Sequence, residues 1–173
     1  PASKPLTDVK KSLYFHVGLI GVLFILQFVL PAYHHGNLAR IMVLASYAMG
    51  YNILFGYTGL LSLGHAMFFA AGMYGMGLPM AHLGWTPEPA LVAGFVVGIA
   101  VSASIGFLAL RTSGVSFMIV TLMFAQAGFL TILYFGEWTR GDEGFVIQQA
   151  ERVMAGIDLS QPANRYNAAL ILF

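Results

Sequence analysis

Two side chains that could do chemistry, Ser62 and His65, lie three positions apart in the stretch GYTGLLSLGHAMFFAAGMYG, residues 56–75. On a helix, a hydroxyl and an imidazole at this spacing can face each other. A hydrolase-type triad also needs a carboxylate, and residues 41–87 contain no Asp or Glu. No second His, Asp or Glu lies at metal-ligand spacing from His65. The stretch therefore predicts neither a catalytic residue nor a metal site.

Other sources of chemistry are also missing from the sequence. His34 and His35 are neighbours, so their side chains point in different directions and form a poor chelating pair. No phosphate-binding loop of the Walker type is present, so we do not expect this chain to hydrolyse ATP. The lack of cysteine excludes disulfides, thiolate metal sites and cysteine nucleophiles. We predict a protein with no catalytic site, metal or cofactor of its own.

The composition is that of an integral membrane protein. The 173 residues are 58% hydrophobic and only 9% charged, whereas soluble domains are roughly a quarter charged. A soluble fold of this size could not cover so much apolar surface. The formal net charge is +1, which does not suggest nucleic acid as a partner.

The few charged residues mark where helices can cross the bilayer. Four intervals without Lys, Arg, Asp or Glu end at Arg40, Glu88, Arg111 and Glu137. A span needs about 20 apolar residues, so the second interval holds two helical segments. We predict an all-α, polytopic membrane bundle in a single transmembrane domain, residues 1–173, with about five spans and the start of a sixth. The expected helices cover residues 13–33, 40–55, 60–83, 89–110, 115–135 and 166 onward.

The charge distribution also predicts an orientation. Lys4, Lys10 and Lys11 place the N-terminus in the cytoplasm. The first apolar run is longer than that of a signal peptide and no small-residue cleavage site follows it, so we expect an uncleaved anchor. The turn at residues 33–39 then lies outside, and the polar stretch at residues 136–165 forms an extracytoplasmic loop.

A helix break is predicted at the start of the stretch quoted above, because each glycine costs a helix interior about 1 kcal/mol relative to alanine. In lipid, the freed backbone groups need partners in protein or in a water-filled cavity, and such breaks commonly lie beside transported solutes. A plain turn between two spans is the alternative, and for His65 the alternative is a packing role. The residues predicted to line a substrate pathway are Gly56, Tyr57, Thr58, Gly59, Ser62 and His65.

Small residues form a stripe along one face of the fourth expected helix. Such stripes let two helix backbones approach closely in lipid, where packing drives association. We expect a helix-packing face, which either lines a pathway or is an ordinary contact between helices. The stripe consists of Ala90, Gly94, Gly98, Ser102 and Gly106.

Several stretches resemble one family. NILFGYTGLLSLGHAMFFAAGMY, residues 52–74, resembles the signature region of the LivH/LivM permeases, the membrane subunits of bacterial ABC importers for branched-chain amino acids and related solutes. It follows closely the LivM-type pattern GYTGLLSLGHAAFFGIGAY. Three further stretches agree in order and spacing: LRTSGVSFMIVTLMFAQ (110–126), WTRGDEGF (138–145) and GIDLSQPANRYNAALILF (156–173).

The resemblance implies a permease subunit of an ABC importer in the bacterial inner membrane. Its solutes would be branched-chain amino acids, or related small solutes such as urea and short amides. The implied partners are a second permease subunit, two cytoplasmic ATPase subunits that bind ATP and Mg, and a periplasmic solute-binding protein. The residues implied in docking the binding protein are Thr139, Arg140, Gly141, Asp142, Glu143 and Gly144.

The chain departs from the family in two ways. Members are usually much longer, so the resemblance implies a C-terminally truncated piece that lacks the ATPase-docking loop. Arg140 and Glu143 replace small or neutral residues of the family loop, which leaves the solute open. Aromatic residues near the break could line an apolar pocket for leucine-like side chains, or could simply pack: Tyr57, Phe68, Phe69 and Tyr74.

Two other function classes remain open. A passive homo-oligomeric channel for small solutes also fits the broken helix and the small-residue stripe. A membrane enzyme, or an accessory subunit of a respiratory complex, would need paired intramembrane acids or haem-spaced histidines. His16 and His65, on separate expected spans, are the crude candidates for the latter.

Overall fold

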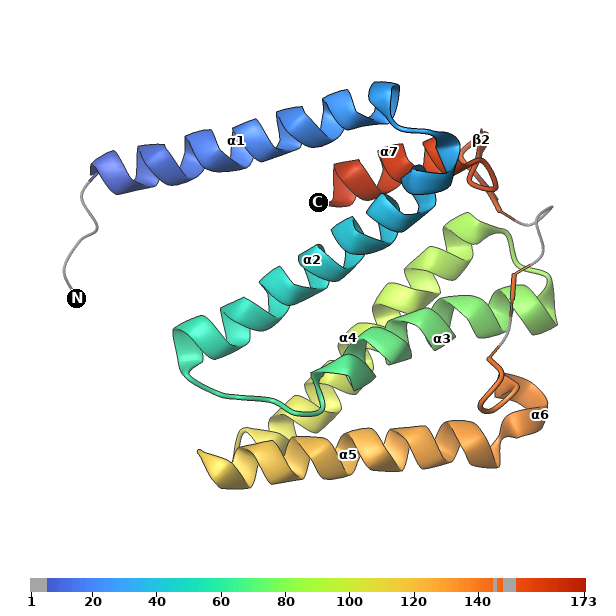
Figure 1. Cartoon of the computed structure of the whole chain (residues 1–173). Coiled ribbons are helices and arrows are strands. Elements are labelled where there is room, and N and C mark those ends of the chain that lie inside the picture. Colours follow the sequence, from blue (N-terminus) through green and yellow to red (C-terminus); the bar gives the residue numbers. More distant parts are fainter. Residues whose placement is uncertain (1–5, 145, 148–151) are drawn as a thin grey trace. The chain divides into compact units, whose positions relative to one another are not determined.

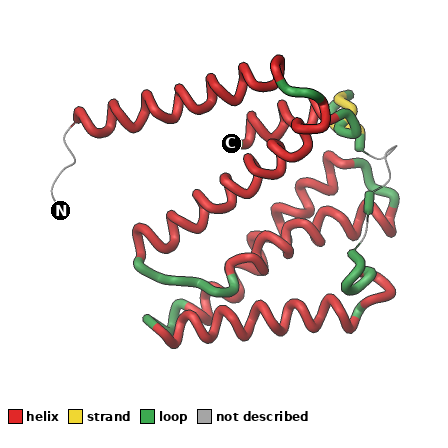
Figure 2. The backbone as a smooth tube through the Cα atoms, in the orientation of Figure 1, coloured by secondary structure: helices red, strands yellow, loops and turns green. Residues whose placement is uncertain are grey.

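The computed structural model describes residues 6–144, 146–147 and 152–173. Contacts within this part group the chain into two compact units, Pro1–Ser46 with Leu159–Phe173, and Tyr47–Asp158. The boundary between the units falls inside the second helix, α2 (Ala32–Thr58). Helices make up most of the described backbone, with one short pair of strands (Figures 1 and 2).

The prediction of an all-α membrane bundle is confirmed. A shorter apolar segment, Leu13–Val29, lies within α1 (Leu6–Val29). The total of about five spans stays a prediction. Three helices of the described part are long and apolar enough to cross a membrane: Ala32–Thr58, Pro87–Ala109 and Gly114–Tyr134.

In the first unit, a proline separates α1 from α2. Proline has no N–H, so Pro31 cannot donate the helical hydrogen bond that the Gln27 carbonyl would accept. The Nε2 atom of His35 lies 3.1 Å from that carbonyl oxygen and takes the place of the missing donor. Because a carbonyl oxygen only accepts, Nε2 carries the hydrogen. The predicted turn at residues 33–39 is wrong, because α2 already begins at Ala32.

The last helix, α7 (Pro162–Leu172), belongs to the same unit. It begins at Pro162 and not at Tyr166 as expected, since proline is well suited to the first turn of a helix. The Tyr166 side chain is fully buried, and its hydroxyl donates to the Leu23 carbonyl of α1 at 2.5 Å. Its ring centroid lies 5.3 Å from that of His35, so α1, α2 and α7 meet at these two side chains.

The second unit is built on α3 (His65–Leu83), α4 (Pro87–Ala109) and α5 (Val115–Tyr134). Glycines bring α3 and α4 together (Figure 1). A Cβ added at Gly94 would lie 2.8 Å from the Gly72 carbonyl oxygen, and one at Gly75 would lie 2.7 Å from the Val97 Cβ. Neither position can hold a larger side chain without a shift, which is the close approach that small residues allow in lipid.

After α5 come the short helix α6 (Gly136–Thr139) and a β-hairpin that the sequence did not predict. The hairpin pairs β1 (Val153–Met154) with β2 (Ile157–Asp158). Its two turn residues, Ala155 and Gly156, both have positive φ, at 48° and 78°. This is the backbone that two-residue hairpin turns favour. The Glu88 carboxylate at the start of α4 accepts the N–H of Ala155 at 2.8 Å and so holds the turn.

Candidate functional site

The helix break lies a few residues later than expected, at residues 59–64, called the break loop below. Gly56, Tyr57 and Thr58 form the last turn of α2, so their placement in the break is wrong. The Thr58 hydroxyl donates to the Leu54 carbonyl at 2.5 Å, which closes that turn. The chain leaves the helix at Gly59, where φ is +69°. This left-handed backbone suits glycine and is a common way to end a helix.

The break loop is tied to α5 by Thr121. The N–H of Leu63 donates to the Thr121 hydroxyl at 3.2 Å, and that hydroxyl donates to the Met118 carbonyl at 3.0 Å. Thr121 is 1% exposed. One residue further, a Cβ at Gly64 would overlap the backbone carbonyl of Thr121 and lie 2.7 Å from its carbon. The end of the break loop therefore rests directly on the backbone of α5.

Sequence reasoning missed Thr121, although a signal was present. It is the polar residue in the middle of the apolar run FMIVTLMF, residues 117–124. Threonine in a membrane helix often returns its hydrogen bond to its own backbone, which makes it hard to recognise as a contact. The distance of 58 residues between Leu63 and Thr121 along the chain hides the pair.

His65 begins α3 and is surrounded by aromatic rings. Its ring centroid is 5.2 Å from that of Tyr47, 5.2 Å from that of Tyr51 and 5.8 Å from that of Phe68. Phe69 lies 5.6 Å from Tyr47 and extends the same group. The second half of α2 and the first turns of α3 thus share an aromatic cluster around the half-buried imidazole.

Ser62 and His65 come close in sequence but form no hydrogen bond with each other. Ser62 is 4% exposed, and within the described residues its hydroxyl has no hydrogen-bond partner. The Nδ1 atom of His65 is also covered and unpaired in that part of the chain. Tyr57, in contrast, is 86% exposed and lies outside this group. The described residues hold no group of His, Cys, Asp or Glu that could bind a metal.

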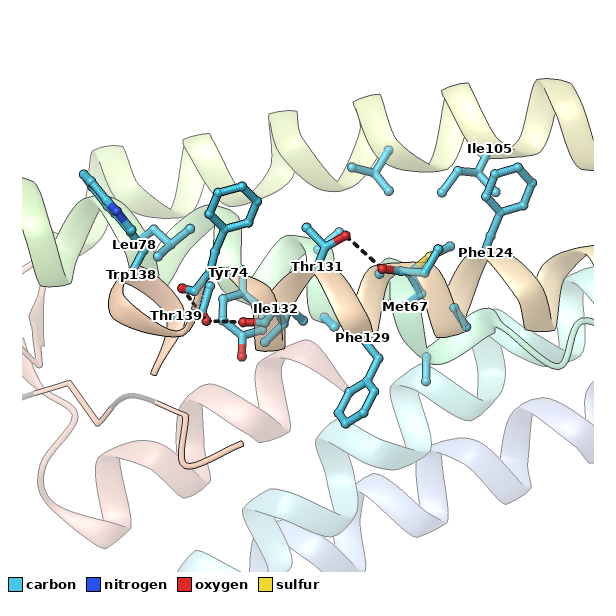
Figure 3. Close-up of a pocket in the computed structure, with 18 residues that line it drawn as sticks. Met67, Tyr74, Leu78, Ile105, Phe124, Phe129, Thr131, Ile132, Trp138 and Thr139 are labelled. Carbon is cyan, nitrogen blue, oxygen red and sulfur yellow. Dashed lines mark hydrogen bonds between the residues drawn. The ribbon is translucent and has the colours of Figure 1, made fainter. Parts of the chain in front are cut away.

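A groove of about 860 Å³ runs between α3 and α5 (Figure 3). Its walls are almost entirely apolar, with Met67 and Leu78 on α3, Phe124 on α5, and Ile105 on α4. The hydroxyl of Thr131 is bonded back to its own helix, at 2.8 Å from the Ala127 carbonyl. The groove therefore offers a hydrocarbon surface and little that would hold a polar solute.

The expected docking residues sit in and after α6. Thr139 is only 7% exposed, and its hydroxyl donates to the Ile132 carbonyl at 2.6 Å, so it holds the turn in place. Arg140, Asp142 and Glu143 are exposed and supply the charged surface of this segment. Gly141 and Gly144 are half-buried, with positive φ of 52° and 64° that turn the chain.

The neighbouring Trp138 connects this segment to α3. The Nε2 atom of His82, near the end of α3, lies 2.7 Å from the Trp138 carbonyl oxygen. The two rings also meet, with centroids 5.1 Å apart. Because the carbonyl oxygen can only accept, Nε2 of His82 is the donor.

The small-residue stripe divides between contact and open surface. Ala90 is fully buried, and Gly94 lies against the α3 backbone as described above. A Cβ at Gly98 would lie 3.6 Å from Gly72, in ordinary contact. Ser102 lines a shallow apolar groove between α3 and α4. At Gly106 a Cβ would meet no atom within 4 Å in the described part, so the packing does not extend that far.

Comparison with known proteins identifies the family. Residues 35–171 match the model of the "Branched-chain amino acid transport system / permease component" family. The chain belongs to this family. It is 32% identical over 125 residues to the "High-affinity branched-chain amino acid transport system permease protein LivM" of Escherichia coli K12. That alignment covers 70% of this chain and 28% of the relative. No solved structure matches the chain.

Membership in the family agrees with the apolar helices. This is a permease-type, multi-pass membrane protein, and its likeness is to a transport protein and not to an enzyme. The matched residues include the break loop, Thr121, and the whole aromatic cluster around His65. The resemblance noted in the sequence is thereby confirmed.

Proposed function

We propose that this chain is part of the permease subunit of an ABC importer that carries branched-chain amino acids across the bacterial inner membrane. The family and the LivM relative are named for branched-chain amino acid transport, which supports this solute class. The chain spans 28% of the length of that relative, so the activity belongs to the whole permease and its partners. Those partners are a second permease subunit, two cytoplasmic ATPase subunits that bind ATP and Mg, and a periplasmic binding protein.

The break loop carries the proposal. Non-helical backbone at membrane depth is tolerated where it is buried in protein or lines a cavity. The break loop fits the first condition on one side, through Leu63 and Thr121. It also presents Ser62 and His65, whose covered polar atoms have no partner in the described residues. We infer that the solute passes beside this loop, with the aromatic cluster close to its apolar side chain.

The exposed charges after α6 are the proposed contact with the binding protein. Arg140, Asp142 and Glu143 lie in the segment expected outside the membrane, and mixed charges steer docking more than they add affinity. Trp138 and Thr139 hold this segment onto α3 and α5 from within. The proposed orientation places the N-terminus in the cytoplasm.

The test uses the natural complex purified through this subunit and reconstituted into liposomes. When the binding protein and labelled leucine are supplied to these liposomes, we expect leucine uptake that depends on ATP. Native mass spectrometry of the purified complex should show a second permease and two ATPase subunits. His65→Gln should lower uptake several-fold, whereas His34→Gln should leave it unchanged, because His34 is exposed in the other unit. Uptake of leucine without ATP by a homo-oligomer would instead make the protein a passive channel. Uptake of urea but not leucine would keep the importer and change the solute.

A further inference from the structure

We infer that Thr121 is a positioning residue for transport: its hydroxyl holds the break loop, and with it Ser62 and His65, at the solute path. Only the location beside the transported solute rests on the proposed function. The attachment of the break loop to α5 does not depend on that function and is tested separately.

The geometry gives Thr121 two contacts with the loop, of different kinds. Its hydroxyl accepts the Leu63 N–H at 3.2 Å. Its backbone carbonyl lies so close to Gly64 that even a Cβ there would overlap it. A hydroxyl can accept one hydrogen bond while donating another, and Thr121 does so by donating to Met118 at 3.0 Å. Valine has the same shape but can do neither.

Other hydrogen bonds of the break loop, within the described residues, stay local. The N–H of Gly59 donates to the Phe55 carbonyl at 3.0 Å, and that of Leu60 to the Thr58 hydroxyl at 3.3 Å. Both partners lie in the end of α2. The Gly64 carbonyl accepts the Met67 N–H of the following helix at 3.0 Å. The bond from Leu63 to Thr121 is thus the one that joins the loop to a helix other than the two that flank it, within the described part.

The position of this bond decides what it controls. Leu63 lies directly between Ser62 and Gly64, and His65 follows as the first residue of α3. If the Leu63 N–H loses its acceptor, it stays unpaired at a partly buried position or moves to find another partner. The first response makes the closed loop less stable, and the second shifts Ser62, which is 4% exposed in this packing.

Residues 1–173 contain no cysteine, so a thiol introduced here is selective once reactive cysteines elsewhere in the complex are replaced. Ser62→Cys puts a nearly isosteric thiol into the loop, and its reaction rate with N-ethylmaleimide in the assembled complex reports how often the loop opens. Adding Thr121→Val should raise this rate about tenfold, the factor that corresponds to about 1.4 kcal/mol. Thr121→Ser keeps the hydroxyl and should stay within about twofold of the parent rate.

Thr131→Val is the matched control on the same helix. Thr131 also bonds back to its own backbone, at 2.8 Å from the Ala127 carbonyl, but it does not touch the loop. The Thr131→Val substitution removes the same hydroxyl group and should leave the rate at which Ser62→Cys reacts with N-ethylmaleimide unchanged. Equal rates for Thr121→Val and the parent, or equal acceleration by Thr131→Val, would overturn the inference.

A second measurement protects the test against a variant that does not fold. In the unaltered complex, hydrogen exchange at the Leu63 amide should be much slower than at Leu60, whose bond to Thr58 is exposed. A Leu63 amide that exchanges as fast as that of Leu60 contradicts the attachment without any substitution.

The transport readout separates positioning from stability. In the complex without the Ser62→Cys substitution, Thr121→Val should raise KM for leucine several-fold while the maximal rate per folded complex changes less than about twofold. Thr121→Ser should restore KM. A fall in rate with unchanged KM would make Thr121 merely structural. If the unaltered complex carries no leucine at all, the proposed function fails, whereas the labelling result still decides the role of Thr121 in the loop.

Discussion

Replacing His35 with phenylalanine removes one hydrogen bond and keeps an aromatic ring of similar size. The lost bond joins Nε2 to the Gln27 carbonyl at 3.1 Å, and Pro31 has no N–H to replace it. The Gln27 carbonyl, at the end of α1, is then unpaired next to position 35, where the native histidine is 7% exposed. The Tyr166 ring, 5.3 Å away, retains a partner. The change therefore removes this hydrogen bond together with the Nδ1 atom, which has no partner among the described residues.

The expected cost follows from the partial burial of this hydrogen bond. An unpaired buried group costs about 1–3 kcal/mol, and hydrogen bonds between membrane helices have measured values of about 0.6–1.7 kcal/mol. We expect His35→Phe to destabilise the protein by about 1.5 kcal/mol. Unfolding in mixed micelles with increasing sodium dodecyl sulfate measures this difference. The neighbouring exposed residue gives the control, and His34→Phe should change stability by less than about 0.5 kcal/mol.

A double-mutant cycle tests why His35→Phe destabilises the protein, and not only by how much. Pro31→Ala restores an N–H at the position where the helical ladder would pair it with the Gln27 carbonyl. In that background His35→Phe should cost about 1 kcal/mol less, because the carbonyl has a second donor available. Strictly additive effects of the two substitutions would refute the argument that His35 replaces the donor that proline lacks.

Three further substitutions, the first with a matched control, test contacts in the second unit. Gly94→Ala should destabilise the protein by about 1–3 kcal/mol in the same micelle titration, because its Cβ would lie 2.8 Å from the α3 backbone. The control is Gly106→Ala, whose Cβ would meet open space in the described part, and it should be neutral or slightly stabilising. Gly64→Ala should cost about 1–3 kcal/mol because it forces a Cβ onto the backbone of α5, and an unchanged transition midpoint would contradict that contact. Glu88→Gln should speed hydrogen exchange at the Ala155 amide several-fold, since a charged acceptor is replaced by a neutral one; an unchanged rate would mean that the carboxylate does not hold the turn.

The sequence predicted those features that hydropathy and charge control. The spans expected at residues 89–110 and 115–135 differ from α4 and α5 by two residues or fewer at each end. Here charged or glycine-containing turns follow directly after long apolar runs. The end of the apolar run and the helix-breaking residues therefore place each helix end at nearly the same position. No such agreement exists at the start of α2, where a proline ends one helix and the next begins at once.

The break was harder to locate because glycine has two roles. Gly56 and Gly59 look equivalent in the sequence, yet only Gly59 takes a left-handed backbone. Gly56 remains helical, with the Asn52 side chain beside it. A helix tolerates one glycine for about 1 kcal/mol, so Gly56 need not end α2. The helix ends where the backbone turns left-handed at Gly59, and composition alone does not reveal which of the two glycines does so.

The contacts of α3 show which part of this unit is least tied to other helices. Just before α3 begins, the break loop meets α5 through Leu63 and Thr121, and near its end α3 meets the segment after α5 through His82 and Trp138. Along its middle, glycines press it against α4, where no larger side chain fits. A helix held at both ends and along one face moves only together with its neighbours. The first half of the break loop, from Gly59 on, has only local hydrogen bonds in the described residues, so a change in the angle between α2 and α3 costs least there.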